Sequence, residues 1–536
     1  MHPHRLRAPS SDGVSLADPP LDRIGELARA NAGRLGRWDH DFQGRRAGRL
    51  RAMARAQIMA LARRYHDAFG LDWPDLPARP GRLFVTGHQP ELFHPGVWVK
   101  NFAVAGLAEA EGGVGLNLIV DNDIPKGPTV RVPHPEGDGL RASAIAFDSW
   151  AGEVPYEDQT VRDGDLFATF GARARSTLGG TVANPLLDDF WPRVLRRAGD
   201  TDRVGLRFAL ARREVEAGWG ARNVEVPIGA ACESEAFLWF ASHLLAHLPR
   251  FQAVHNASLA RYRAAYGIRS THHPVPALGR QGEWLEAPFW AWRADAPRRR
   301  PLMVRMHPRT MDLRIGGEDA PFLEIPLGAD RDACCAVEAL QGLPARKIRL
   351  RTRALTTTLF ARYLLGDVFV HGIGGAKYDE LGDELARGFF GIEPPPFLTL
   401  SMTLWIGLES DPATPEALRA VERSLRDLDF NPDRHLPEPR PDAARPSVEG
   451  KWAAIEGEVA THRQRVDRLR AIRQANRELA PWTVDARSAL LAERDRLRAG
   501  LKRNGVARSR EYAFPLHGAA RLREAMEGAL SRAAGR

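Results

Sequence analysis

The alternation of apolar and polar residues predicts helices at both ends of the chain and a mixed α/β region between them. Near the start, Leu21, Ile24 and Leu27 recur three residues apart, and helical spacing continues through residues 21–69. A proline-rich joint at residues 73–81 ends this segment, because proline lacks the backbone N–H group that a continuing helix uses.

A β–α–β pattern follows the joint. An apolar strand at residues 83–85 precedes a helix-compatible segment at 97–110, and a second apolar strand lies at 116–120. A connection through a single helix implies parallel pairing of the two strands and a right-handed crossover. A second strand–turn–helix unit occupies residues 367–390, and a further strand at 397–400 can extend the sheet. The pattern predicts an α/β fold with a parallel sheet.

The last part of the chain carries a heptad pattern. Its seam is apolar except at one position and comprises Trp452, Ile455, Val459, His462, Val466 and Leu469. Pro481 interrupts the pattern, and a second charged helix is expected at about 485–503. We therefore expect an antiparallel α-helical coiled-coil hairpin, whose surface across residues 449–503 is a candidate for homodimer formation.

These patterns predict a chain of several regions. Residues 127–225 are mixed in pattern and rich in Gly, Pro and Asp, which indicates an insertion on the core. The expected regions are an N-terminal helical segment at 1–80, a core formed by 81–126 and 226–405, an insertion or cap at 127–225, a helical coiled-coil hairpin at 406–511 and a C-terminal return to the core at 512–536.

Composition narrows the class of protein. No apolar run approaches the roughly 18 residues needed to span a bilayer, and the basic start of the chain is not followed by the apolar stretch of a signal peptide. The cysteines, Cys232, Cys334 and Cys335, suit neither a disulfide framework nor a zinc site. We expect a reduced, cytoplasmic protein with no membrane partner.

The net charge of +9 at pH 7 raises the question of a nucleic-acid partner. Only six of the 76 basic residues are lysines, and this preference for arginine is typical of a GC-rich genome, so no nucleic-acid partner is predicted. Where arginine is the usual cation, a retained lysine can serve as a compact point charge. Lys100, Lys126 and Lys377 fall within the three polar turns described next.

The first polar turn follows the strand at 83–85. Its candidate binding residues are Thr86, Gly87, His88, Gln89, His94 and Lys100. A strand-to-helix turn gathers backbone N–H groups and a helix N-terminus, so these residues can bind phosphate or carboxylate oxygens. His88 can in addition transfer a proton. The alternative is that Thr86 and Gln89 only cap the following helix.

The second polar turn follows the strand at 116–120 and holds Asp121, Asp123 and Lys126. The carboxyl ends of parallel strands meet at one edge of a sheet, so we expect Asp121 and Asp123 to face the first turn across one crevice. Paired carboxylates beside a lysine can orient an amine, bind ribose hydroxyls, hold a metal or act as a base. The alternative is an Asx-turn with a surface ion pair.

The third polar turn has candidate residues His371, Gly372, Gly374, Gly375, Lys377 and Asp379. Glycines near a helix start can expose successive N–H groups to an anion. Their spacing matches neither the dinucleotide-binding fingerprint nor a Walker motif, so the position after a core strand is the stronger argument. His272, His273 and His307 have no partner at ligand spacing, and no metal is predicted.

Together, the segment from Thr86 to Phe93, the acidic strand end at Asp121–Asp123 and the glycine turn resemble the bacillithiol biosynthesis cysteine-adding enzymes, over residues 81–536. That family comprises ligases that join cysteine to glucosaminyl-malate. The resemblance implies a Rossmann-like core with a late coiled-coil hairpin, small-molecule substrates and ATP or ADP as the nucleotide. It also implies that His88, Asp121 and Asp123 are catalytic and that the third turn closes over the nucleotide or acyl donor.

The chain departs from the family pattern at the expected site. The family has Thr-Gly-Gln-Gln where His88 takes the third place, and Gly-Glu-Asp-His-Asp at the acidic strand end. Its glycine turn, Gly-Gly-Pro-Gly-Glu, is here Gly372-Ile373-Gly374-Gly375-Ala376. These departures favour a changed acid, amine or thiol substrate. The two alternatives are a nucleotidyltransferase-like enzyme with another substrate and a non-enzymatic coiled-coil binding protein.

Overall fold

The computed structural model describes residues 6–76, 81–328 and 332–536, so residues 77–80 of the predicted proline-rich joint lie outside the description. Internal contacts divide the chain into two compact units, which are described separately. Unit 1 comprises Met1–Val132, Ser143–Gly407 and Arg510–Arg536, and unit 2 comprises Pro133–Ala142 and Leu408–Ser509. Within the described part of the chain, every helix is too short or too polar to cross a membrane.

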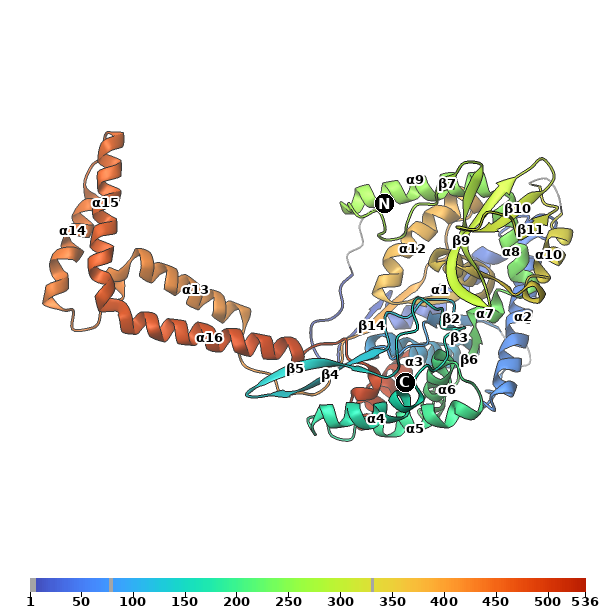
Figure 1. The fold of residues 1–536 in the computed structure, drawn as a ribbon, viewed down its shortest axis with the longest axis horizontal. Coiled ribbons are helices and arrows are strands. Elements are labelled where there is room, and N and C mark those ends of the chain that lie inside the picture. Colours follow the sequence, from blue (N-terminus) through green and yellow to red (C-terminus); the bar gives the residue numbers. More distant parts are fainter. Residues whose placement is uncertain (1–5, 77–80, 329–331) are drawn as a thin grey trace. The chain divides into compact units, whose positions relative to one another are not determined.

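Unit 1 is built on a mixed sheet with parallel strands, which bears out the α/β prediction (Figure 1). Its strands lie in the order β1 (Ser15–Asp18), β14 (Leu398–Met402), β13 (Val368–His371), β2 (Leu83–His88), β3 (Val114–Ile119) and β6 (Val224–Pro227). All neighbours pair in parallel except β1, which runs antiparallel to β14. Every residue of β3 is buried, as expected for a strand covered on both faces.

Helix α3 (Pro95–Ala110) connects β2 to β3 and packs against β2, β3 and β14. It is apolar on most of its surface, and Trp98 and Phe102 are fully buried. Helix α17 (Ala519–Ala533), near the C-terminus, packs on α3. The last segment of the chain therefore covers a core helix, and its buried residues, such as Leu522 and Met526, stabilise this packing.

Helices α1 (Ile24–Gly36) and α2 (Ala47–Ala68) form the helical N-terminal part, and α2 packs on β6. Three further helices of unit 1 pack together with α2. They are α8 (Glu235–Ala246), which contacts α2, α9 (Leu248–Tyr266), which contacts α8, and α12 (Ile373–Leu385), which contacts α9. The α12 helix connects β13 to β14, which brings the third polar turn to the same sheet edge as the first.

A second, antiparallel sheet was not predicted from the sequence. Its strands lie in the order β11 (Leu323–Ile325), β10 (Met311–Ile315), β9 (Ala296–Met306), β8 (Trp284–Arg293) and β12 (Ile348–Thr352), and β7 (Arg280–Gln281) pairs with β8. Residues 283–292, which hold three tryptophans, contribute most of strand β8 in this sheet. Its partner β12 carries side chains to the edge of the parallel sheet.

The segment at 127–225, predicted as an insertion or cap, contributes to both units, because Pro133–Ala142 belongs to unit 2 and the rest to unit 1. It contains the hairpin of β4 (Thr129–Glu136) and β5 (Gly139–Ala146), and the helices α4 (Gly164–Leu178), α5 (Leu187–Arg196) and α6 (Val204–Gly218). Glu216 of α6 is fully buried and accepts hydrogen bonds from Trp98 Nε1 (2.6 Å) and Asn101 Nδ2 (2.7 Å) of α3. These contacts make α6 part of the core packing rather than of a separate cap.

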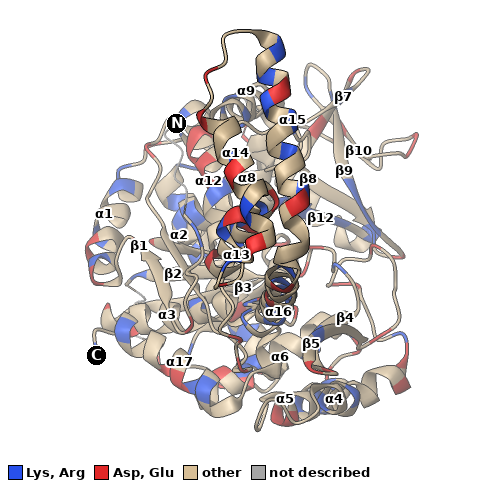
Figure 2. Ribbon diagram, turned by 90° about the vertical axis from the view of Figure 1, so that its left-hand side faces the viewer, with Lys and Arg blue, Asp and Glu red and all other residues tan. Residues whose placement is uncertain are grey.

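Unit 2 differs from the predicted hairpin in how its helices are divided and paired. Helix α14 (Arg445–Glu456) packs on α15 (His462–Leu479), while α13 (Pro415–Phe430) packs on α16 (Val484–Ala507). The heptad seam predicted as one helix is interrupted, because a capping box of Thr461 and Gln464 starts α15 afresh. Figure 2 shows basic and acidic residues interspersed along α14 and α15, as on solvated helices.

Candidate functional site

A cavity of about 560 Å³, here called the first cavity, lies at the carboxyl ends of β2, β3 and β13. Strand β2 has β3 as its neighbour on one side and β13 on the other, so the strand order reverses direction at β2. Ligands of open α/β sheets bind at such a point. The antiparallel sheet supplies the opposite wall through Trp290, Arg299 and Thr352. The volume of the first cavity falls within the range of small-molecule pockets.

The first cavity brings together residues from all three predicted turns. Those that line it are Gly87, His88, Gln89, Lys100, Asp123, His371, Gly372, Gly374 and Gly375. Six predicted residues do not line it, namely Thr86, His94, Asp121, Lys126, Lys377 and Asp379. The sequence pattern therefore predicts the strand ends, whereas the side-chain directions and the second wall depend on tertiary packing.

Lys100 is a buried cation without a counter-ion. Its side chain lies on α3, the residue is 3% exposed, and no described residue forms a hydrogen bond or ion pair with Nζ. Burial, helped by the charge of Arg510, lowers the pKa of Lys100 to about 7. A Cβ at Gly372 would lie 3.0 Å from Nζ, so the ammonium group borders the third turn. An unpaired buried charge is costly, and a bound anion would remove that cost.

Helix α12 begins beside Lys100 and adds to the positive potential there. Gly372 is its N-cap, and an added Cβ at Gly374 would meet no atom within 4 Å, so this first turn faces open space in the cavity lining. The first N–H groups of a helix have no partner within the helix and favour an anion. Lys100 and the start of α12 together form an anion-binding arrangement.

Thr86 holds His88 in one tautomer. The Thr86 hydroxyl donates its only proton to Val370 O (3.0 Å), and its oxygen lies 3.2 Å from His88 Nε2. With the hydroxyl proton directed to Val370 O, Nε2 donates to the Thr86 oxygen, and Asn101 supplies a further side-chain hydrogen bond to the ring. Burial and the nearby charge of Lys100 lower the pKa of His88 well below its ordinary value. Thr86, which was predicted to bind the ligand, instead positions a neutral imidazole.

Asp123 is held from three sides. Gln89 Nε2 donates to its Oδ2 (2.9 Å), while Arg299 Nη1 (2.7 Å) and the backbone N–H of Ile124 (2.9 Å) donate to Oδ1. Arg299 lies 4.6 Å above the ring of Trp290. Nothing in the sequence paired Arg299 of β9 with Asp123.

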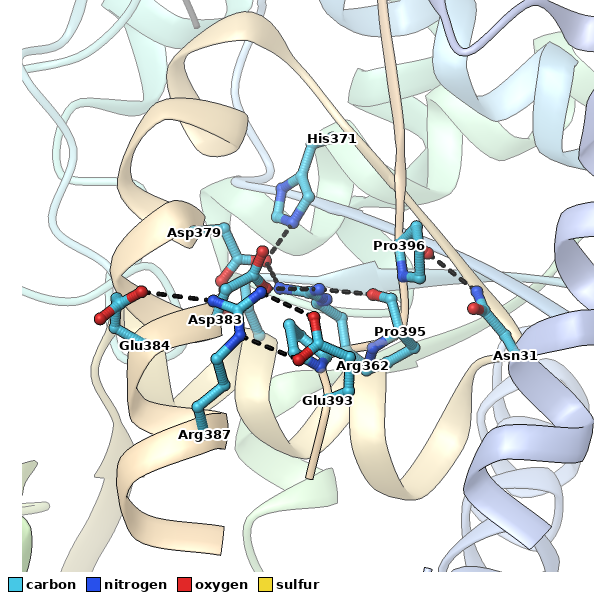
Figure 3. Close-up of polar contacts among 12 residues, drawn as sticks. Asn31, Arg362, His371, Asp379, Asp383, Glu384, Arg387, Glu393, Pro395 and Pro396 are labelled. Carbon is cyan, nitrogen blue, oxygen red and sulfur yellow. Dashed lines mark hydrogen bonds and ion pairs between the residues drawn. The ribbon is translucent and has the colours of Figure 1, made fainter. Parts of the chain in front are cut away.

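Asp379 lies behind the cavity and positions His371 (Figure 3). Its Oδ2 accepts from His371 Nε2 (2.7 Å) and Arg362 Nη1 (2.5 Å), and its Oδ1 accepts from the Thr358 hydroxyl (2.9 Å). Burial opposes ionisation, but the charge of Arg362 and the hydrogen bonds from His371 and Thr358 hold the pKa of Asp379 well below its usual range. The ionised carboxylate fixes Nε2–H on His371 and leaves Nδ1 as an acceptor.

The close approach of His371 to the glycine turn explains one glycine. A Cβ at Gly375 would lie 2.7 Å from His371 Nδ1, closer than a side-chain atom can approach. Burial lowers the pKa of His371, although the charge of Asp379 opposes this change. His88 and His371 are thus two neutral imidazoles in the lining of the first cavity, each protonated at Nε2.

Four other predictions require correction. Asp121 Oδ1 accepts from Gly229 N (2.8 Å), and Asp121 lines a separate cavity beyond β3. His94 is the N-cap of α3 and accepts from Gly96 N (3.1 Å). Lys126 is exposed, and Lys377 lies on a different face of α12, in a groove with Glu380 and Asp383. In each case the turn or helix directs the side chain away from the first cavity.

Among the residues that the structure describes, no group of three or more His, Cys, Asp or Glu side chains is arranged to hold a metal ion. No protein-family model matches the chain, and no curated protein sequence matches it at a significant level. The chemistry of the site therefore rests on the contacts, burial and charge of its own residues.

Proposed function

We propose that the protein is a ligase that forms a carbon–nitrogen bond between an acidic substrate and an amine, with the first cavity as its active site. The observation that carries this proposal is Lys100, a buried ammonium group with no counter-ion among the described residues, at the start of α12. An anionic group, either a carboxylate or a phosphate of ATP, would complete this arrangement.

The sheet supports a Rossmann-like assignment as part of this proposal. Numbered along the chain, the parallel strands β2, β3, β6, β13 and β14 lie in the order 3-2-1-4-5. This is the order found in dinucleotide-binding folds, where the ligand lies over the first strand and its neighbours. The order agrees with the fold that the resemblance to the cysteine-adding ligases implies, and an amino-acid substrate of the cysteine type follows from the same resemblance.

The residues of the first cavity suit carboxylate activation followed by attack of an amine. Lys100 and the N–H groups of α12 would stabilise the negative charge of the activated acid and of the departing phosphate. His88 or His371 would accept a proton from the amine, because each is neutral and fixed by a hydrogen bond at Nε2. Asp123 would hold Gln89 and Arg299 in position around the substrates.

Coupling of cysteine to glucosaminyl-malate in the presence of ATP tests the proposal, with mass spectrometry to detect the product. We expect His88→Ala and Asp123→Ala to reduce turnover at least 100-fold while the melting temperature stays within a few degrees. Lys377→Ala is the matched control and should retain activity, because its side chain lies outside the first cavity. Full turnover in both test variants would contradict the site assignment.

The products and a melting screen distinguish the alternatives. Release of pyrophosphate without a coupled product would favour a nucleotidyltransferase-like enzyme. A ligand that binds the folded state raises its apparent stability, so a screen with ATP, ADP, malate and cysteine should show shifts for an enzyme. A flat screen together with dimerisation through residues 449–503 would favour a binding protein, and that dimer stays a prediction.

A further inference from the structure

A second cavity, of about 260 Å³, lies beyond β3 at the same edge of the parallel sheet. Its lining includes Ile119 at the end of β3 and Pro227 at the end of β6. No residue lines both cavities, so the second cavity is a separate space. Its polar lining centres on Tyr65, Asp121, Glu157, Gly229, Arg349 and Arg351.

The buried guanidinium groups of this cavity already have carboxylate partners. Arg351 binds Glu157 through two nitrogens (2.9 and 2.8 Å) and also binds Glu233 (2.9 Å). Arg349 lies 3.5 Å from both Asp158 and Glu233. Arg351 is 2% exposed. A third arginine of the lining, Arg203, is exposed, so water screens its charge.

Asp121 has no ion-pair partner among the described residues. Its Oδ1 accepts from Gly229 N (2.8 Å), which leaves Oδ2 available. A Cβ built on Gly229 would lie 3.2 Å from Asp121 Oδ2 and 2.9 Å from Glu157 Oε2. The two carboxylate oxygens therefore converge on a small space that exists because residue 229 has no side chain. Burial and the charge of Glu157 raise the pKa of Asp121 to about 7, although the charge of Arg351 opposes this change.

Tyr65 provides a second, independent observation that points to a ligand. It is 7% exposed and lines the second cavity, and its hydroxyl is buried without a hydrogen-bond partner among the described residues. Buried hydroxyls are nearly always paired, because an unpaired one loses its hydration without compensation. Apolar side chains, Phe69, Ile119 and Leu206, form the remaining wall near this hydroxyl.

We propose that the second cavity binds a small molecule with a primary ammonium group and a short apolar body, with the ammonium between Asp121 and Glu157. The ammonium donates hydrogen bonds to Asp121 Oδ2 and Glu157 Oε2, and the apolar body packs against Phe69, Ile119 and Leu206. This site is independent of the ligase chemistry proposed for the first cavity. Monovalent organic cations suit it better than a metal ion, since no metal-binding cluster was found among the described residues.

Thermal unfolding of the full chain with n-butylammonium chloride tests the site at pH 8, where Asp121 is ionised. n-Butanol is the uncharged control and sodium chloride the ionic control. We expect the melting temperature to rise with butylammonium alone. Equal shifts with n-butanol or sodium chloride would overturn the proposal, as would the absence of any shift up to about 50 mM butylammonium.

Two variants probe the carboxylate pair in different ways. Asp121→Asn removes the charge, and Gly229→Ala keeps both carboxylates but places a methyl group between them. Each should weaken butylammonium binding at least tenfold, while Asp319→Asn, an exposed carboxylate outside both linings, should leave it unchanged. Gly229 lies in a helical turn without a positive φ, so alanine is compatible with its backbone. Undiminished binding in both variants would overturn the proposal.

Discussion

The two cavities lie at the same edge of one sheet and carry opposite unpaired charges. In the first, the ammonium group of Lys100 has no anion, and in the second, Asp121 has no cation. By contrast, the buried Arg212 is neutralised within the protein by Glu216 and Glu225. In the two cavities, the sign of the unpaired charge indicates the sign of the ligand that would pair with it.

Burial produces the same pKa in both cavities from opposite directions. It lowers the pKa of Lys100 to about 7 and raises that of Asp121 to about 7, because the charged form of either group is disfavoured away from water. Groups perturbed in this way are concentrated in functional sites. In contrast, Asp379 is equally buried but ion-paired, and its pKa is held low.

Replacing Lys100 with Met should have the largest effect. The pKa of Lys100 is lower in the folded state than its usual 10.5, so the protein without ligand loses stability as pH falls from about 10.5 to about 7. Removing the charge should therefore raise the free energy of unfolding at pH 7 by up to about 5 kcal/mol, since each unit of pKa shift corresponds to about 1.4 kcal/mol. Urea denaturation measures this change.

The same substitution should weaken binding of ATP or malate at least 100-fold in calorimetry. Arg510→Met is the matched comparison, because it removes another cation near Lys100. Unlike Lys100, Arg510 already has partners, since it donates hydrogen bonds to the Ser401 hydroxyl and to Met402 O. A Lys100→Met protein that is less stable and still binds anions would mean that the ammonium group has an unrecognised partner, and the comparison between the cavities would fail.

Asp379→Asn should have the opposite effect on stability. This substitution removes the charge of Asp379 from its ion pair with Arg362. Arg362, whose side chain is 2% exposed, is then left with a weaker partner. Loss of one member of a buried ion pair costs about 3–5 kcal/mol. Urea denaturation should show that loss, while Asp319→Asn, whose carboxylate is exposed, should change stability by less than about 0.5 kcal/mol. Equal, small effects in both variants would show that pairing at Asp379 contributes little.

The elements around the first cavity could be predicted because their signals are local. Apolar runs marked β2, β3 and β13, and the polar residues at their ends marked the sheet edge. The partners of those residues could not be predicted, because Arg299 and Arg362 come from elements that meet the turns only through tertiary packing. Asp121 shows the same limit, since the turn after β3 sends Asp121 and Asp123 to different cavities.

The heptad pattern failed for a related reason. Residues spaced by three and four indicated one continuous helix, but local capping at Thr461 ends the pattern and starts α15. Trp452 and Leu469 of the expected seam are 41% and 53% exposed. Periodicity shows which residues share a helix face, whereas a capping box decides where the helix begins.

Ligand binding to the first cavity should depend on pH through Lys100. The ammonium form binds the anion, so affinity for malate, which stays ionised above pH 6.5, should fall as pH rises through about 7. Calorimetry between pH 6.5 and 9 should show a decline of up to about tenfold per pH unit above 7. Lys100→Met should remove the dependence, and Asp121→Asn should preserve it. A dependence that disappears in Asp121→Asn would show that the two cavities are coupled.

The smallest expected effect concerns the hydroxyl that fixes His88. Thr86→Val keeps the shape of the side chain but removes the link between Val370 O and His88 Nε2. A neutral hydrogen bond contributes about 1 kcal/mol, so we expect a change of about fivefold in turnover and a shift in the tautomer populations seen by ¹⁵N NMR of His88. Thr86→Ser keeps the hydroxyl and should restore both. If only the serine variant is impaired, the methyl packing of Thr86 matters and its hydroxyl does not. If only the valine variant is impaired, the neutral His88 protonated at Nε2 is the form that the first cavity uses.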